Sequence, residues 1–312
     1  MFVMLLVSFL MNERLNIISD GLHYFNNCEW IGFRVAGDGG AIYYASPNGQ
    51  IKLESCLISN CSCLNSGNVA GGACIYESIS AIISKTCFNN CFSDKCTNYR
   101  LYSYSNKLLS STLEFVSETS GKSNSFSSHS GGKNYHYVNN HNSSGNYAPS
   151  YFGGLGFNTS PNGVVGAYSQ VCNSRVEGLL SFYAGSASLE VHHFNLISNN
   201  ITQGGWICVH NQNPSLVLRD MIIQKNTAHT SVFLMPGTTH KAAFHNCIID
   251  IAHSSSYFAK CTFTNCTFVT TASPIIYSFH ETKQCGEFYK ETLTLVLPIK
   301  SYWRYLFITI LY

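Results

Sequence analysis

The chain has 312 residues, of which 11% are charged, and its formal net charge is +2 at pH 7. Soluble globular domains contain about 25% charged residues, so the long charged side chains that favour helices are scarce here. Lys and Arg are scattered along the chain, which argues against the basic stripe of a nucleic-acid-binding protein. We therefore expect a β-rich protein with no nucleic-acid partner.

The amino-terminal end is apolar, and only Ser8 interrupts the run from Met1 to Met11. Such a run resembles the hydrophobic part of a signal peptide, but no basic residue precedes it and no clear small-residue cleavage site follows it. Residues 1–19 are accordingly expected to be either a signal peptide or a strand that caps the fold.

A repeated unit follows. Gly-Gly-Ala-Ile-Tyr at 39–43 returns as Gly-Gly-Ala-Cys-Ile-Tyr at 71–76, and Cys-Leu-Ile-Ser-Asn-Cys at 56–61 returns as Cys-Phe-Asn-Asn-Cys at 87–91. Offsets of 30 to 32 residues indicate one unit with turns of different length. We expect the glycines to form tight corners instead of phosphate-binding loops, because no Lys-Ser/Thr pair follows them.

Cysteines mark this unit, and 14 of them in one chain favour an oxidising, extracellular setting. Cys28, Cys61 and Cys91 end equivalent strands, whereas Cys56 and Cys87 begin two of them. Equivalent positions on stacked strands lie about 4.8 Å apart, which is within disulfide range. One expectation is therefore a disulfide between Cys56 and Cys87 or between Cys61 and Cys91. The other is a stack of buried, reduced thiols.

The segment 101–154 loses the repeat and is rich in Ser, Asn, Tyr, Gly and His. Alternating residues at 102–104 and 113–115 favour degenerate turns of the same unit over an exposed insertion, since long structureless loops are uncommon. Within it, Ser120–Gly132 has Phe126 as its only large apolar residue. We expect Ser120–Gly132 to be a loop.

The clearest copies of the unit are 188–199, 215–226 and 241–249, at offsets of 27 and 26 residues. Their apolar residues alternate with a period of two, which is typical of half-buried strands. A unit this short cannot bury its apolar face alone and must stack on its neighbours. We therefore predict an all-β, right-handed parallel β-helix over residues 20–290. Its inward side chains are expected to form two columns: Leu189, Leu216 and Ala242, and Val191, Leu218 and Phe244.

Residues 291–312 are expected to form a carboxy-terminal tail. Two apolar stretches there are separated by Lys300 and Arg304, so neither approaches the ~20 residues needed to cross a bilayer. We expect no complete transmembrane segment, and a truncated end is one explanation of this tail.

Several short motifs resemble known families. Gly-Gly-Ala-Ile at 39–42 and Phe-Asn-Asn at 25–27 and 88–90 resemble the repeats of polymorphic outer-membrane proteins, which are β-helical adhesins related in fold to pectin lyases. Cys-Thr-Phe-Thr-Asn-Cys at 261–266 and Gly-Gly-Ala-Cys at 71–74 resemble surface proteins of trichomonad-like protists. The resemblance implies a β-helix at the cell surface that acts in adhesion.

Catalytic chemistry finds little support in the residues. A β-helix lyase needs clustered acidic calcium ligands beside a basic residue, and a glycoside hydrolase needs two facing carboxyl groups. The aspartates are instead spread along the chain: Asp20, Asp38, Asp94, Asp220 and Asp250. Arg219 and Asp220 are expected to point to opposite faces, as adjacent strand residues do. The histidines at 192–193 and 136–141 are expected to be solvated and to lack an acidic partner. We therefore expect no catalytic residue, no cofactor and no metal site.

Asn-x-Ser/Thr motifs provide candidate N-glycosylation sites at Asn60, Asn142, Asn158, Asn200 and Asn265. With the cysteines, they favour an extracellular or cell-surface location. We expect a monomeric, non-catalytic β-helix that binds a protein or glycan ligand on another surface. The alternatives are a polysaccharide lyase or glycoside hydrolase of the pectin-lyase-like class, and the product of a truncated, non-functional gene copy.

Overall fold

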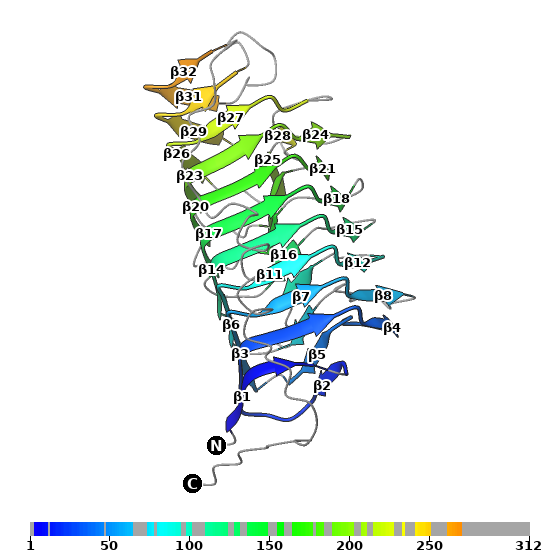
Figure 1. Cartoon of the computed structure of the whole chain (residues 1–312). Coiled ribbons are helices and arrows are strands. Elements are labelled where there is room, and N and C mark those ends of the chain that lie inside the picture. Colours follow the sequence, from blue (N-terminus) through cyan, green and yellow to red (C-terminus); the bar gives the residue numbers. More distant parts are fainter. Residues whose placement is uncertain are drawn as a thin grey trace.

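In the computed structural model, the chain winds into a solenoid whose turns stack along one axis, from β1 at the lower end to β32 at the upper end (Figure 1). The structure describes these residues: 3–11, 13–46, 48–64, 74–77, 80–94, 98–101, 110–123, 128–131, 136–148, 155–158, 164–176, 179–183, 189–202, 207–210, 215–227, 233–234, 241–250 and 261–269. The expected tail at 291–312 lies outside them.

The strands form three sheets, and within each sheet they pair in parallel. In each turn the chain passes through the first sheet, then the third and then the second. The first sheet has these 16 strands: β1 (Val3–Leu10), β3 (Leu22–Ile31), β6 (Gln50–Glu54), β7 (Leu57–Ser59), β10 (Ser80–Ser84), β11 (Cys87–Asn89), β14 (Ser110–Thr119), β17 (His136–Ser144), β20 (Val164–Cys172), β23 (Leu189–Ile197), β26 (Ser215–Arg219), β27 (Ile222–Gln224), β29 (Lys241–His245), β30 (Ile248–Ile249), β31 (Cys261–Thr264) and β32 (Thr267–Phe268).

The other two sheets consist of shorter strands. The second sheet has β2 (Leu15–Ile17), β5 (Ile42–Ala45), β9 (Cys74–Glu77), β13 (Tyr99–Leu101), β16 (Ser128–Gly131), β19 (Leu155–Asn158), β22 (Leu180–Tyr183), β25 (Ile207–His210) and β28 (Phe233–Leu234). The third sheet has β4 (Arg34–Ala36), β8 (Ser62–Leu64), β12 (Phe92–Ser93), β15 (Lys122–Ser123), β18 (Tyr147–Ala148), β21 (Arg175–Val176) and β24 (Asn200–Ile201). The described part is thus all-β, and the predicted parallel β-helix is confirmed.

The strand register follows the offsets read from the sequence. β23 pairs with β26, with Val191 opposite Leu218, and β26 pairs with β29, with Leu218 opposite Phe244. These three side chains are buried, as predicted, and Leu216 is buried opposite Ala242. Alternate residues of a strand point to the same face, so in-register stacking buries whole columns of apolar side chains.

The apolar amino-terminal run forms β1, which pairs in parallel with β3 from Val3 opposite Leu22 to Leu10 opposite Glu29. Residues 3–10 of this segment thus form a strand in the structure, and the signal peptide stays a prediction.

Degenerate turns of the repeat fill the described part of segment 101–154. β14 and β17 continue the first sheet, with Leu113 opposite Val138. The expected loop at Ser120–Gly132 was wrong in its described residues, because Lys122–Ser123 and Ser128–Gly131 are strands β15 and β16. Backbone hydrogen bonds to the neighbouring turns hold these strands, and small side chains such as buried Ser123 fit inside without an apolar pattern.

Two bends in each turn are made by residues in the left-handed backbone conformation. The first corner divides the first-sheet strand, and φ there is about +50° at Asn27, Ser55, Lys85, Asn140, His193, Asp220, Asn246 and Asn265. The second corner follows the first sheet, at Gly32, Asn60, Asn90, Ser120, Gly145, Asn173, Ser198 and Lys225. Asn and Gly dominate because they adopt this conformation at low cost.

The adjacent residues Asn26 and Asn27 allow a matched test of the first corner. Asn26 lies in the extended part of β3, whereas Asn27 has a φ of 52°. We expect Asn27→Val to lower the free energy of unfolding by about 1–2 kcal/mol, because a β-branched residue is strained in the left-handed conformation. Asn26→Val should have less than half that effect. Urea denaturation of the two variants measures this, and equal losses would contradict the corner assignment.

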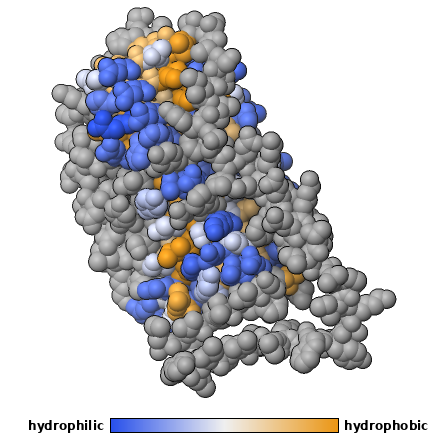
Figure 2. Space-filling model, turned by 60° about the vertical axis from the view of Figure 1, so that its left-hand side comes forward, coloured by the Kyte–Doolittle hydropathy of each residue, from blue (hydrophilic) through white to orange (hydrophobic). Residues whose placement is uncertain are grey.

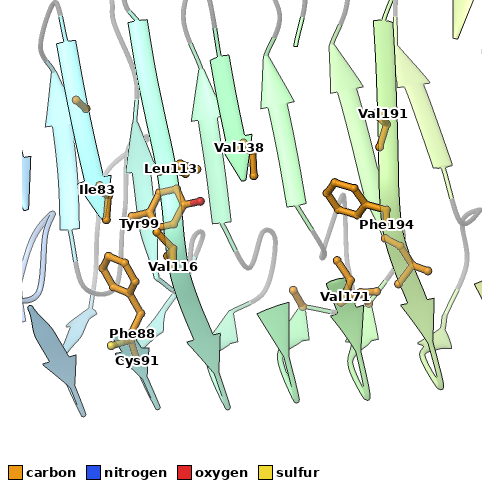
Figure 3. Close-up of a cluster of buried hydrophobic side chains, with 14 of the residues drawn as sticks. Ile83, Phe88, Cys91, Tyr99, Leu113, Val116, Val138, Val171, Val191 and Phe194 are labelled. Carbon is orange, nitrogen blue, oxygen red and sulfur yellow. The ribbon is translucent and has the colours of Figure 1, made fainter. Parts of the chain in front are cut away.

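Inward side chains from successive strands fill the interior between the sheets (Figure 3). Phe88 and Tyr99 approach with ring centroids 5.4 Å apart, and Val171 and Phe194 continue the core toward the upper end. The core is therefore continuous along the rod, and it encloses the polar residues described next.

Candidate functional site

A carboxyl group and an imidazole meet inside the solenoid. Glu118 occupies the inward column in which Phe88 precedes it and Ser143 follows it. His141 occupies the neighbouring inward column, after Val116 on the adjacent turn. Both side chains have 0% exposure, and Glu118 Oε1 lies 2.7 Å from His141 Nε2.

We call Glu118 and His141 the lumenal pair. Two further polar side chains contact it. The Asn98 amide donates to Glu118 Oε2 over 2.7 Å, and the Tyr99 hydroxyl lies 3.3 Å from His141 Nε2. The backbone N–H of His141 donates to the Ser169 hydroxyl. Each carboxylate oxygen therefore has a polar partner, as a buried ionisable group requires. The arrangement is sealed, which suits a structural role better than contact with a substrate.

The expectation that the histidines of 136–141 are solvated and lack an acidic partner was wrong for His141. The left-handed residue Asn140 reverses the alternation, so the residue after the corner points inward again. Its partner Glu118 lies on the preceding turn, 23 residues earlier. Strand alternation alone could not reveal either point.

Four of the cysteines occupy two inward columns. Cys28 lies one turn from Cys56, because the register sets Glu29 opposite Leu57. The expectation that Cys28 is equivalent to Cys61 and Cys91 was therefore wrong, since Phe33 takes the position next to Cys61. Cys61 and Cys91 are likewise aligned, and all four are buried thiols instead of disulfides. The structure thus shows them stacked and buried, and their reduced state in the native chain stays a prediction.

The pairing of Cys56 with Cys87 was wrong by one residue. The offset between these two turns is 30 in the first sheet, so Cys87 lies opposite Leu57, and Thr86 takes the position next to Cys56. Cys87 is in a disulfide, but Cys56 is a reduced thiol, so the two are not joined. Leu57 and Cys87 pack against Ile31 in a small cluster apart from the main core.

Burial raises the pKa of the Cys61 and Cys63 thiols to about 11, from an ordinary value of 9.0. The folded chain therefore keeps these protons at a pH where the unfolded chain loses them, so this stabilisation is complete below about pH 9 and is lost as the pH rises towards 11. The thiolate is the nucleophile, so we expect iodoacetamide to label both residues slowly at pH 8 in the folded chain and rapidly in urea. Mass spectrometry of the peptides measures this, and equal rates would refute the burial.

Polar side chains replace the cysteines in the upper turns of the second column. Gly121 N–H donates to Asn146 Oδ1, Asn146 N–H to Ser174 Oγ, and Ser174 N–H to Asn199 Oδ1. Asn199 N–H donates to Asn226 Oδ1 over 3.0 Å. We call Asn146, Ser174, Asn199 and Asn226 the asparagine ladder. In each of these contacts, a side chain of one turn accepts a hydrogen bond from a backbone N–H of the turn before it.

Charged and imidazole side chains gather on the outward face of β23, β26 and β29. Because the first corner reverses the alternation, both members of each adjacent pair face outward, as at His192-His193 and Arg219-Asp220. The expectation that Arg219 and Asp220 point to opposite faces was therefore wrong. We call this set the outward cluster: Glu190, His192, His193, Arg219, Asp220 and His245.

The contacts within the outward cluster are ionic and polar. Arg219 Nε lies 2.6 Å from Glu190 Oε1, with both side chains about half exposed. His193 Nε2 lies 3.9 Å from Asp220 Oδ2, so His193 does have an acidic neighbour. Burial and the adjacent His193 lower the pKa of His192. Figure 2, which turns the left flank of Figure 1 forward, shows hydrophilic residues gathered in the upper part of that flank.

The aspartates do not gather in one place. Asp20 accepts hydrogen bonds from Ser46 and Asn48, whereas Asp250 accepts one from the backbone of Lys225. Asp38 and Asp94 both act electrostatically on Cys63, and Asp220 belongs to the outward cluster. Within the described ranges there is no group of three or more His, Cys, Asp or Glu side chains arranged to hold a metal ion.

The candidate glycosylation sites differ in exposure. Asn60, Asn200 and Asn265 are exposed, but Asn142 is buried and cannot carry a glycan in this fold. The side chain of Asn158 lies outside the described residues.

No family model, curated protein or solved structure matches this chain. Nor do the described residues include a helix long and apolar enough to span a bilayer.

Proposed function

We propose that this chain is a non-catalytic β-helix that works outside the cell or at its surface, where its outward face binds a protein or glycan. The observation that supports this proposal most is the alignment of outward side chains in rows along the rod. At the upper end the rows contain the outward cluster. At the lower end Tyr24 donates to Glu54 over 2.6 Å, and the Lys52 ammonium lies 4.6 Å from the Tyr24 ring.

Rows of this kind suit many weak contacts. Neighbouring turns are about 4.8 Å apart, so outward side chains recur at a fixed spacing. Once one contact has formed, the next contact is intramolecular and has a high effective concentration. A partner with its own repeats therefore binds more tightly than it would through a single contact. Tyr and Arg, which occur in these rows at Tyr24 and Arg219, are enriched at protein interfaces.

The buried chemistry argues in the same direction. A carboxyl group beside an imidazole, as in the lumenal pair, is an arrangement that many catalytic sites use. Both side chains of this pair have 0% exposure. A substrate must come within hydrogen-bond reach of a catalytic acid or base. Nor do the described residues supply the clustered ligands of a calcium-dependent lyase.

Two assays on the full chain test this proposal. A tagged chain should be stained on intact, non-permeabilised cells that produce it, and the purified chain should bind saturably to intact cells or to an array of glycans and surface proteins. Staining only after permeabilisation, or an absence of saturable binding, would refute it.

The same purified chain should not cleave pectin, pectate or related uronic-acid polymers, with or without added calcium. Lyase chemistry needs an acidic calcium cluster beside a base, and the described residues contain no group of three or more His, Cys, Asp or Glu side chains arranged to hold a metal ion. Unsaturated and reducing-end sugars are measured against a heat-killed control. Release well above that control would favour the polysaccharide-processing alternative.

A further inference from the structure

Two ring nitrogens face each other on the outward cluster. The Nδ1 atoms of His192 and His193 are 3.0 Å apart, and the rings meet edge to face at 81° with centroids 5.3 Å apart. Consecutive strand residues normally point to opposite faces. Here the left-handed conformation of His193, with a φ of 54°, brings both imidazoles to the same side.

We propose that His192 and His193 form a bidentate site for a transition-metal ion of the zinc, nickel or copper class. Imidazole is a ligand that these ions prefer. The inference goes beyond the proposed function, since it assigns a ligand to the outward face without depending on the partner that this face binds.

The spacing of the two nitrogens fits a shared ion. Imidazole nitrogens bind such ions at about 2.0–2.1 Å, so two ligands at 90–110° to each other are separated by about 2.9–3.4 Å. The 3.0 Å between the Nδ1 atoms lies within this interval. A hydrogen bond between the two rings explains the same distance, but it is a modest interaction between half-exposed groups, and a metal ion replaces it.

The neighbours of the pair support the assignment. A metal-binding histidine usually directs its other ring nitrogen to a carboxylate, which orients the ring and raises its basicity. His193 Nε2 faces Asp220 Oδ2 at 3.9 Å, and the Asn246 amide donates to Asp220 Oδ1 over 3.2 Å and holds that carboxylate. On the other side, the Arg219 guanidinium is engaged by Glu190, which reduces its repulsion of a cation.

Two protein ligands of the site lie in the described part of the chain, and water, a further residue or a donor from another molecule fills the remaining positions. Such a site binds more weakly than a structural zinc site with four protein ligands. It therefore suits a reversible contact on the surface better than a role in holding the fold.

The experiment is a titration of the purified, chelator-treated full chain with Ni²⁺ and with Zn²⁺, followed by calorimetry. Peptide mapping after diethylpyrocarbonate treatment shows which histidines the metal protects. Circular dichroism confirms that each variant is folded.

The variants are chosen to preserve the turn. His193→Asn keeps a residue that the same corner uses at Asn140 and Asn246, and His192→Gln keeps a polar side chain on the strand. Both should abolish the saturable binding and the protection. Asp220→Asn should weaken binding about 10–100-fold, since it removes a carboxylate behind the ligand.

His245→Gln is the matched control, because His245 lies in the same outward column as His192, beyond Arg219. It should bind the metal as the unaltered chain does. The proposal is overturned if the unaltered chain shows no saturable binding, if His192→Gln and His193→Asn bind normally, or if His245→Gln loses binding equally. None of these results bears on the cell-surface staining or the partner binding that tests the proposed function.

Discussion

His141→Leu should lower the free energy of unfolding by about 1–3 kcal/mol, the usual cost of leaving a buried polar group without its hydrogen-bond partner. The substitution leaves the buried carboxyl group of Glu118 with the Asn98 amide and without its imidazole partner. Urea denaturation of the full chain, followed by far-ultraviolet circular dichroism, measures the change.

The double substitution Glu118→Met with His141→Leu distinguishes the pair from simple packing. Replacing both partners with apolar residues of similar size leaves neither a buried carboxyl group nor a buried imidazole without its partner. The double variant should therefore be more stable than His141→Leu alone. A double variant as unstable as the sum of the two single variants would show that the pair contributes nothing beyond the volume of its members.

Phe194→Ala should cost about 3–5 kcal/mol, because it removes a fully buried ring and leaves a cavity. Phe194 has 1% exposure and lies in the same inward column as Met221, which follows it on the next turn. The ring points into the core in Figure 3.

Glu190→Ala on the same strand is the control for Phe194→Ala. Glu190 is exposed and its ion pair with Arg219 is open to solvent, so its loss should change stability by less than about 1 kcal/mol. Equal effects of the two substitutions would contradict the assignment of inward and outward faces on β23.

The parts of the fold that sequence predicted best are those where the repeat and the strand period agree. Val191 and Leu218 are related by the offset of the repeat, and apolar residues alternate around both of them. The repeat therefore predicted their pairing, and the alternation predicted their burial. The pairing of Cys56 with Cys87 failed because the two cysteines are 31 residues apart while the turns are offset by 30. A single residue decides which face a side chain takes.

The candidate sites were harder to predict because they depend on the corners. His141 faces inward and the pair at 192–193 faces outward, and in both cases a left-handed residue resets the alternation. An asparagine in the repeat suggests such a corner, but His193 carries no such signal. The partnership of Glu118 with His141 further requires two turns to be set in register, which no local pattern specifies.

The asparagine ladder gives the rod a direction. Each backbone donor in the second corner column receives its acceptor from the turn that comes later in the chain, as Ser174 N–H does from Asn199 Oδ1. The amide of Asn199 also donates back to the carbonyl of Val171, on the preceding turn. A growing chain therefore completes each turn only when the next one docks on it. Assembly from the amino-terminal end satisfies the buried donors one turn at a time, in the order in which a ribosome delivers them.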